Sequence, residues 1–149
     1  MIDPQAFRSL ALDQLTNAIG VYALCDLDGQ PIYVGQSVDG IRARVRRHLT
    51  SARSDVIANR QIDVWEIAYV WAWPLDAVEH VAPLEASIFA RYDAEQPLMN
   101  GKSLLADMWD VPWPEKQSVQ VIHEDERRVR MSPAQRLPRQ IQQYNLLVD

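Results

Sequence analysis

Residues 20–48 read GVYALCDLDGQPIYVGQSVDGIRARVRRH, and this stretch decides the fold that we expect. Its two short apolar segments, Gly20-Val21-Tyr22 and Tyr33-Val34-Gly35, lie on either side of Asp28-Gly29, a dipeptide typical of a tight turn. They are predicted to form the two antiparallel strands of a hairpin, which would bring Tyr22 and Tyr33 close together. Their hydroxyl groups could bind, orient or deprotonate a water molecule. Taken alone, however, two half-buried strand aromatics would explain the pair as well.

An arginine-rich helix is predicted directly after the hairpin, over residues 40–53. Residues 40–54 contain five arginines and no acidic residue, and arginine is well suited to bind a phosphate through two hydrogen bonds. Arg44 and His48 are four residues apart, so both lie on one side of the helix, beside its apolar stripe. There Arg44 could stabilise charge on a phosphoryl oxygen, and His48 could orient water or carry a proton. The alternative is the solvated basic face of a surface helix.

Length, charge and cysteine content limit the class of protein. The 149 residues are 48% hydrophobic, which is enough for one domain with its own core. The net charge of −5 excludes a protein that coats nucleic acid through its overall charge, although a local basic face still allows phosphate binding. The single cysteine, Cys25, excludes an internal disulfide and a cysteine-cluster metal site. Because neither a signal peptide nor an apolar run of membrane-spanning length is visible, we expect a cytoplasmic protein without a membrane partner.

The remaining pattern predicts an α+β fold, in which helices flank a small three-stranded antiparallel sheet. We expect residues 1–104 to form the main domain with an N-terminal helix, and residues 105–149 to form a C-terminal extension packed on the same domain. Within the extension, apolar residues on both sides of an acidic turn predict a hairpin over residues 119–131. The inward face of the first helix is predicted to carry Phe7, Leu10, Ala11 and Leu15. The predicted helices cover residues 5–18, 40–53, 75–92 with a break near Pro83, 102–108 and 138–148, and the predicted strands cover residues 21–26, 32–35 and 62–73, the last ended by Pro74.

Two further polar residues, Glu85 and Asn100, have a sequence context that needs an explanation. The helix predicted over residues 75–92 places Glu85 on an apolar face, together with Val81, Leu84, Ile88 and Tyr92. A lone carboxylate on such a face is costly unless it is paired or bound to a metal. Glu85 is therefore either a ligand of a hard cation such as Mg²⁺ or one half of a buried ion pair. Asn100 precedes Gly101, and an asparagine in such a position commonly caps the next helix.

In their order and spacing these segments resemble the GIY-YIG nuclease superfamily, and the resemblance runs from Gly20 to Asn100. The two segments that name the family read Gly20-Val21-Tyr22 and Tyr33-Val34-Gly35 in this chain. Each motif alone is weak, whereas five motifs in the family's order are specific. Arg44 and His48 match the family's arginine that is followed four residues later by histidine or tyrosine. Glu85 matches the family's metal-binding glutamate, and Asn100 matches its asparagine after Pro-x-x.

The resemblance implies a metal-dependent endonuclease that hydrolyses phosphodiester bonds in DNA through a single divalent cation, Mg²⁺ or Mn²⁺. It implies that Glu85 holds this cation and that Arg44 stabilises the pentavalent phosphate. It also implies that Tyr22 or His48 activates or orients the attacking water. The remaining members of the implied catalytic set, which position and support the site, are Tyr33 and Asn100.

Contacts to DNA and the branch of the family are less specific in the sequence. The repair nucleases of the family usually carry lysine after the second segment, where this chain has Gln36. Histidine at position 48 makes the chain look more like the homing and restriction endonucleases. The residues expected to contact DNA are Gln36, Arg42, Arg46 and Arg47.

A non-catalytic nucleic-acid-binding or protein-interaction module on the same fold is the alternative hypothesis. This hypothesis is motivated by the acidic net charge, by the lack of a recognisable DNA-reading domain and by the two tryptophans Trp109 and Trp113. The C-terminal extension could contribute contacts of its own, because its apolar residues 141–148 are compatible with the seam of a homo-oligomer as well as with core packing. Its candidate contacts to DNA or to a second subunit are Arg127, Arg128, Arg130, Arg136 and Arg139.

Overall fold

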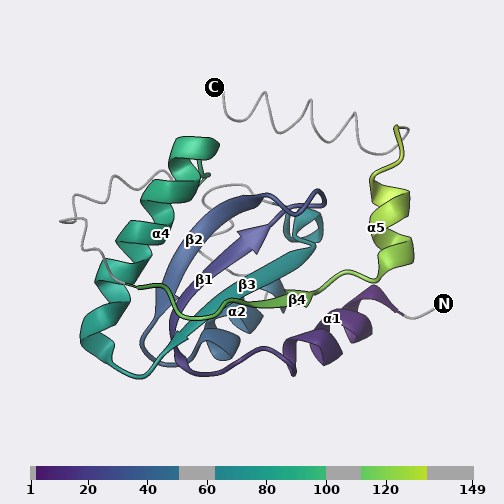
Figure 1. The fold of residues 1–149 in the computed structure, drawn as a ribbon. Helices are drawn as coiled ribbons and strands as arrows, with labels where there is room; N and C mark the ends of the chain where they lie inside the picture. Colours follow the sequence, from purple (N-terminus) through teal and green to yellow (C-terminus); the bar gives the residue numbers. More distant parts are fainter. Residues whose placement is uncertain (1–2, 51–62, 100–111, 134–149) are drawn as a thin grey trace.

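The structure is a computed structural model that describes residues 3–50, 63–99 and 112–133. An antiparallel sheet with the strand order β2-β1-β3-β4 carries helices on both of its faces (Figure 1). The predicted α+β class is confirmed, but the sheet has four strands within these described ranges, where three were predicted. The strands are β1 (Ile19–Cys25), β2 (Pro31–Ser37), β3 (Tyr69–Leu75) and β4 (Gln117–Gln120). The helices are α1 (Pro4–Leu12), α2 (Ile41–Thr50), α4 (Val81–Glu95) and α5 (Glu124–Arg130), with two 3₁₀ turns, η1 (Val64–Glu66) and η2 (Val78–His80).

Strands β1 and β2 form the predicted hairpin. The carboxylate of Asp26 accepts hydrogen bonds from the backbone amides of Asp28 and Gln30, at 3.0 and 2.9 Å, and so closes the turn. Gly29 in this turn has φ +81°, a value that glycine adopts without strain. The resulting register places Tyr22 opposite Gly35 and Leu24 opposite Tyr33. Both tyrosines therefore project from the same face of the sheet.

The two faces of the sheet are covered by different helices. Tyr22, Leu24 and Tyr33 belong to a core cluster that also contains buried residues of α1 and α2. Val21, Ala23 and Val34, which alternate with them, belong to a second cluster with Leu84, Ile88 and Phe89 of α4. Strand β2 lies at the edge of the sheet and is contacted by both α2 and α4. In Figure 1, α4 runs alongside this edge strand.

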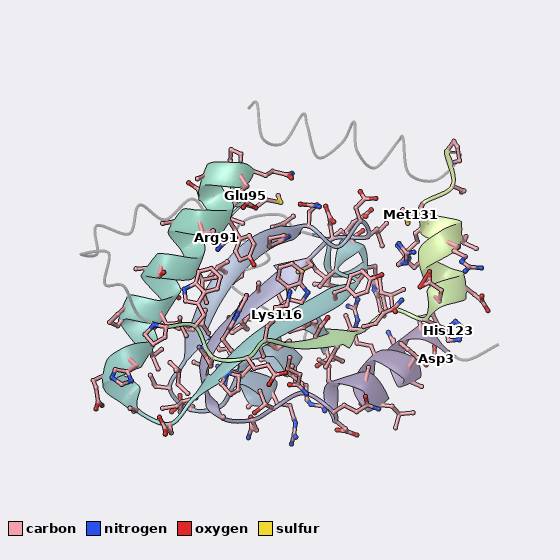
Figure 2. The ribbon with its side chains drawn as sticks, in the orientation of Figure 1. Asp3, Arg91, Glu95, Lys116, His123 and Met131 are labelled. Carbon is pink, nitrogen blue, oxygen red and sulfur yellow. The ribbon has the colours of Figure 1, made fainter. Side chains whose placement is uncertain are left out.

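Four aromatic rings hold the segment after residue 111 against the α4 face. The rings belong to Trp71, Trp73, Tyr92 and Trp113, and the centroids of neighbouring rings lie 5.7–6.4 Å apart. The indole nitrogen of Trp113 also donates a hydrogen bond to the hydroxyl of Ser87, at 3.0 Å. The cations of Lys116 and Arg91, labelled in Figure 2, lie 3.5 Å from the Trp71 ring and 5.4 Å from the Trp113 ring. Trp113 is thus part of the packing between α4 and the sheet.

Three predicted boundaries on the way to α4 were wrong. The third strand begins at Tyr69 and not at residue 62, because residues 64–66 form η1, whose first turn is capped by the carboxylate of Asp63. The same strand runs through Pro74, which is tolerated because β4 pairs only with residues 69–72 and leaves the amide side of Pro74 without a neighbouring strand. The next helix begins at Val81 and contains Pro83 without a break, since an amide in the first helical turn needs no partner within the helix.

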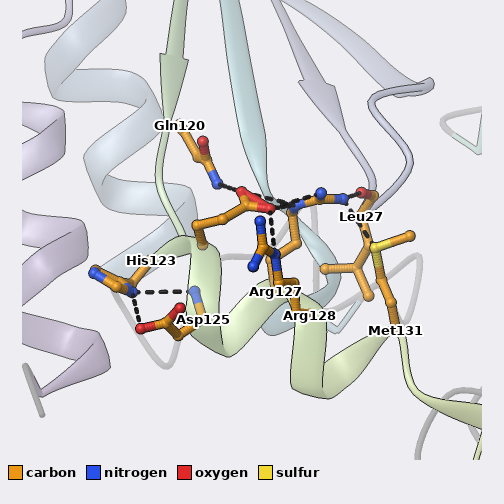
Figure 3. A network of polar contacts seen from close by, with 8 residues as sticks. Leu27, Gln120, His123, Asp125, Arg127, Arg128 and Met131 are labelled. Carbon is orange, nitrogen blue, oxygen red and sulfur yellow. Dashed lines mark hydrogen bonds and ion pairs between the residues drawn. The ribbon is translucent and has the colours of Figure 1, made fainter.

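The predicted hairpin over residues 119–131 was also wrong, because α5 follows β4. His123 caps this helix by accepting a hydrogen bond from the Asp125 amide, at 3.1 Å. Acidic residues occupy its first turn and arginines its last, an order that favours a helix. Arg127 binds the Glu124 carboxylate at 2.7 Å and the Leu27 carbonyl oxygen at 2.7 Å, and so ties α5 to the β1–β2 turn (Figure 3). Gln120 and Arg128 complete this network around Glu124.

Several predictions lie outside the described residues. They include the domain boundary at residue 104, the helices over 102–108 and 138–148, the oligomer seam at 141–148, and the residues Asn100, Trp109, Arg136 and Arg139. Among the helices that the structure describes, none is long and apolar enough to cross a membrane. The cytoplasmic location stays a prediction.

Candidate active site

Tyr22, Tyr33 and His48 form a buried cluster on the α2 face of the sheet. The Nε2 atom of His48 lies 3.1 Å from the Tyr22 hydroxyl oxygen, which is a hydrogen-bonding distance. The rings of the two tyrosines are stacked at 6.3 Å, and the Tyr33 ring meets the His48 ring edge-on at 6.2 Å. All three side chains are at most 4% exposed. The predicted proximity of Tyr22 and Tyr33 is confirmed by these contacts, and His48 of α2 joins the pair.

Gly35 makes room for the Tyr22 side chain. A Cβ atom at this position would lie 2.6 Å from the Tyr22 hydroxyl oxygen and 3.0 Å from the Tyr33 ring. The phenol of Tyr22 therefore passes directly over the backbone of β2 to reach His48. The glycine of the second family segment is thus explained by packing, because any larger residue would push the hydroxyl away from the imidazole.

Arg44 lies next to this cluster, one helical turn before His48. Its Nε atom is buried and has no hydrogen-bond partner among the described residues. Burial and the neighbouring Tyr33 raise the pKa of Tyr22, and the Arg44 guanidinium opposes part of that rise. Tyr22 is consequently a neutral phenol at neutral pH, able to donate its proton to a hydrogen-bond acceptor.

His48 faces this phenol, and in the tautomer protonated on Nδ1 its Nε2 atom accepts the Tyr22 hydrogen bond. Burial, with smaller contributions from the cations of Arg44 and Arg47, lowers the pKa of His48 to about 4. The imidazole is therefore neutral at neutral pH, and its Nε2 atom can accept the Tyr22 proton. A neutral acceptor hydrogen-bonded to a phenol is an arrangement that can move a proton away from a water molecule.

This buried imidazole makes the stability of the protein depend on pH. The pKa of His48 is about 4 in the folded protein and near 6.5 as its ordinary value, so the unfolded chain takes up the proton first as the pH falls. The contribution of neutral His48 is therefore fully present above pH 6.5 and is lost between pH 6.5 and pH 4. We expect a loss of up to about 3 kcal/mol in the free energy of unfolding across this window.

Urea unfolding at pH 7.5 and pH 4.5, for the wild type and His48→Gln, measures this loss. The glutamine variant keeps a neutral hydrogen-bonding side chain but removes the titration. Its free energy of unfolding should fall less between the two pH values than that of the wild type. Equal losses in the two proteins would show that the acid sensitivity comes from other groups.

Glu85 is buried on α4, where it is 5% exposed. Its neighbours Leu84 and Ile88 pack on the sheet face opposite to the one that carries Tyr22 and Tyr33. The sequence correctly places this carboxylate on an apolar helix face, and the structure places that helix against the edge strand β2, which α2 also contacts. A meeting of Glu85 with the tyrosine–histidine cluster stays a prediction.

The four predicted DNA contacts are in two different environments. Gln36 and Arg47 are exposed. Arg42 is instead held by the Leu15 carbonyl oxygen, at 2.8 Å, and Arg46 by the Asp13 carboxylate, at 2.7 Å. Both of these arginines therefore join α2 to the segment after α1. Their spacing in the sequence could not reveal this role, because the partners lie 27 and 33 residues away.

A divalent cation would find few protein ligands here. No group of three or more His, Cys, Asp and Glu side chains that could hold a metal ion occurs within the described ranges. Mg²⁺ commonly uses only one or two carboxylates and takes its other ligands from water and substrate phosphate. A single buried carboxylate such as Glu85, with a phosphate beside it, fits that preference.

Comparison with known proteins agrees with this geometry. Comparison with curated proteins and with solved structures finds no significant match. The family of the GIY-YIG catalytic domain matches residues 18–94, a segment that begins just before β1 and ends within α4. This segment covers just over half of the chain and contains Tyr22, Tyr33, Arg44, His48 and Glu85. The chain therefore belongs to the GIY-YIG family.

Proposed function

We propose that the protein is an endonuclease that hydrolyses phosphodiester bonds in DNA with the help of one divalent cation, Mg²⁺ or Mn²⁺. Family membership implies nuclease activity in general. The observation that supports the proposed chemistry is the buried hydrogen bond between Tyr22 and His48, beside a guanidinium whose Nε atom has no partner among the described residues. These groups supply a proton acceptor and a charge for the phosphate, which are two requirements of phosphodiester hydrolysis.

In this proposal Tyr22 and His48 accept the proton of the attacking water. The Tyr22 oxygen takes the proton from the water while the Tyr22 hydroxyl gives its own proton to Nε2 of His48. The distance of 3.1 Å between these two atoms allows that transfer. His48 then carries the positive charge, and the Tyr33 ring holds the Tyr22 phenol in place through its stacking contact.

Arg44 binds the phosphate in this scheme. Its buried Nε–H group is a donor that the described residues leave unused, and a phosphoryl oxygen would satisfy it with a charge-assisted hydrogen bond. The interaction would strengthen as negative charge develops on the phosphate.

Glu85 is the residue that would hold the cation, at the β2 edge between α2 and α4. When bound, the cation would lower the pKa of the attacking water and neutralise charge on the phosphate. Both α4, which carries Glu85, and α2, which carries His48, contact this edge strand. These shared contacts with β2 support the proposal that one phosphate can contact Glu85 and the tyrosine–histidine cluster at the same time.

Cleavage of supercoiled plasmid, linear duplex, single-stranded DNA and RNA, each with Mg²⁺, Mn²⁺ or EDTA, tests the proposed function. Tyr22→Phe removes one hydroxyl group and is expected to slow cleavage at least about a hundredfold, because the water loses its proton acceptor. Tyr92→Phe is the matched control, since this half-buried tyrosine lies in the cluster on the opposite sheet face. Metal-independent cleavage, or equal rates for the two variants, would contradict the proposed mechanism.

The alternative is a non-catalytic module that binds nucleic acid or a protein. One observation favours it, namely that two of the four predicted DNA-contacting residues, Arg42 and Arg46, are engaged within the protein. The packing of Trp113 against α4 argues against the tryptophan surface that motivated this alternative. Salt-dependent DNA binding that needs Arg47, together with no cleavage of any substrate, would favour the module over the nuclease.

A further inference from the structure

The helix that carries Arg44 and His48 begins at a residue that cannot cap it. Gly40 precedes Ile41, and its carbonyl oxygen accepts the first helical hydrogen bond, from the Arg44 amide at 3.1 Å. Helices usually place Ser, Thr, Asp or Asn at this position, because the side chain oxygen accepts a hydrogen bond from an amide of the first turn. Gly40 has no such oxygen, and its φ of +140° is a conformation that other residues rarely adopt.

The missing cap is supplied by the segment between α1 and β1. The Oδ1 atom of Asn17 accepts a hydrogen bond from the Ala43 amide at 3.0 Å, which is the bond that a cap side chain would normally make. A Cβ atom on residue 40 would lie 2.5 Å from this oxygen, so glycine is needed for Asn17 to reach the helix. Two neighbouring amides donate to backbone carbonyl oxygens of the same segment, Ile41 to Ala18 at 2.9 Å and Arg42 to Thr16 at 3.1 Å.

The capping segment is in turn held by one side chain of β4. Gln117 accepts a hydrogen bond from the Thr16 amide through Oε1, at 2.8 Å, and donates one to the Gln14 carbonyl oxygen through Nε2, at 2.8 Å. Gln117 is the first residue of β4 and pairs with Ala72 of β3. A continuous set of hydrogen bonds therefore runs from the sheet through residues 14–18 to the first turn of α2.

We propose that Asn17 and Gln117 are positioning residues for cleavage, which set the position of α2 and thereby place Arg44 and His48 against Tyr22. Both residues lie outside the segment 18–94 that matches the family. The inference rests on the proposed function, because it assigns a catalytic consequence to the two contacts. Loss of either contact frees the start of α2 to shift, and a small displacement of a catalytic group slows a reaction strongly.

Asn17→Ala and Gln117→Ala test the inference, each with a matched control. Asn17→Asp keeps the acceptor oxygen and should behave as the wild type. Gln120→Ala removes the same amide from the same strand, but the amide of Gln120 binds Glu124 and not the capping segment. Two properties are measured for each protein, namely kcat and KM for DNA cleavage and the titration of the His48 Cε1 proton by NMR.

The expected result is a fall in kcat between about tenfold and about a hundredfold in the two alanine variants, with KM little changed. The pKa of His48 should also rise from about 4 toward 6.5 in both, because a displaced α2 lets water reach the imidazole that now packs against Tyr22 and Tyr33. The two control variants should match the wild type in both measurements.

An unchanged His48 titration in Asn17→Ala and Gln117→Ala would overturn the inference, as would an equal change in Gln120→Ala. The NMR titration needs no catalytic activity, so it distinguishes this failure from failure of the proposed function. If the wild type cleaved no nucleic acid while the two alanine variants still altered the titration, the nuclease proposal would fall and the support of α2 by these residues would stand.

Discussion

Glu85→Gln is expected to slow DNA cleavage by about a thousandfold or more while the protein stays folded. The substitution keeps the size of the side chain and removes only the charge that would hold the cation. At ~1.4 kcal/mol for each factor of ten, such a loss corresponds to about 4 kcal/mol of transition-state stabilisation.

Two measurements test this expectation. The first is the cleavage rate with Mg²⁺ or Mn²⁺. The second is the shift in the midpoint of thermal unfolding when Mn²⁺ is added, because an ion that binds only the folded protein stabilises it. Glu79→Gln is the matched control, because Glu79 lies in η2 just before α4 and is exposed. Cleavage retained by Glu85→Gln, or an unchanged Mn²⁺ effect in this variant, would show that the cation is held elsewhere.

The hairpin and its tyrosines could be predicted because all the information is local. Asp28-Gly29 fixes the turn, and the alternation of side chains then puts Tyr22 and Tyr33 on one face. The four-residue spacing of Arg44 and His48 similarly fixes their common side of α2. These short-range rules account for the shared face of the two tyrosines, whereas the contact of His48 with Tyr22, 26 residues away, comes from the packing of α2 on that face.

Contacts between distant segments could not be predicted in the same way. The sequence indicates that Glu85 lies on an apolar helix face, but it does not indicate which face of the sheet that helix covers. The four residues of β4 are too few to show an alternating pattern, and the strand forms because it pairs with β3, more than 40 residues earlier. The helix α5 could have been predicted, because the charges of Glu124, Arg127 and Arg128 already show the i+3 and i+4 spacing of a helix.

A buried arginine on α1 also escaped the sequence analysis. Arg8 is 1% exposed, whereas Leu10, which was predicted to face the core, is 66% exposed. The inward face of this segment carries Arg8, Ala11, Leu12 and Leu15. A charged residue at the spacing of the apolar residues on one helix face is the signal that drew attention to Glu85. The same signal could have identified Arg8 as a buried residue.

Arg8 joins α1 to three other parts of the chain. Its guanidinium donates hydrogen bonds to the carbonyl oxygens of Ile67 at 2.7 Å and Val64 at 2.8 Å, and longer ones to those of Val121 and Leu49. The Trp65 ring lies 4.2 Å from the guanidinium carbon. Burial and, to a smaller extent, Arg130 lower the pKa of Arg8 to about 10, against an opposing effect of Asp63, so the side chain remains charged at neutral pH.

Arg8→Met is expected to lower the free energy of unfolding by about 3 kcal/mol or more, because it leaves buried carbonyl oxygens without a donor. Arg8→Lys should lose most of this amount as well, since an ammonium group cannot reproduce the planar fork that reaches several carbonyl oxygens. Arg91→Met is the matched control, because Arg91 also lies over a tryptophan ring but is exposed and pairs only loosely with Glu95, at 3.9 Å. It should change the stability by less than about 1 kcal/mol. Urea unfolding at pH 7 compares the three variants, and equal stabilities for Arg8→Met and Arg91→Met would show that the Arg8 hydrogen bonds do not hold α1 in place.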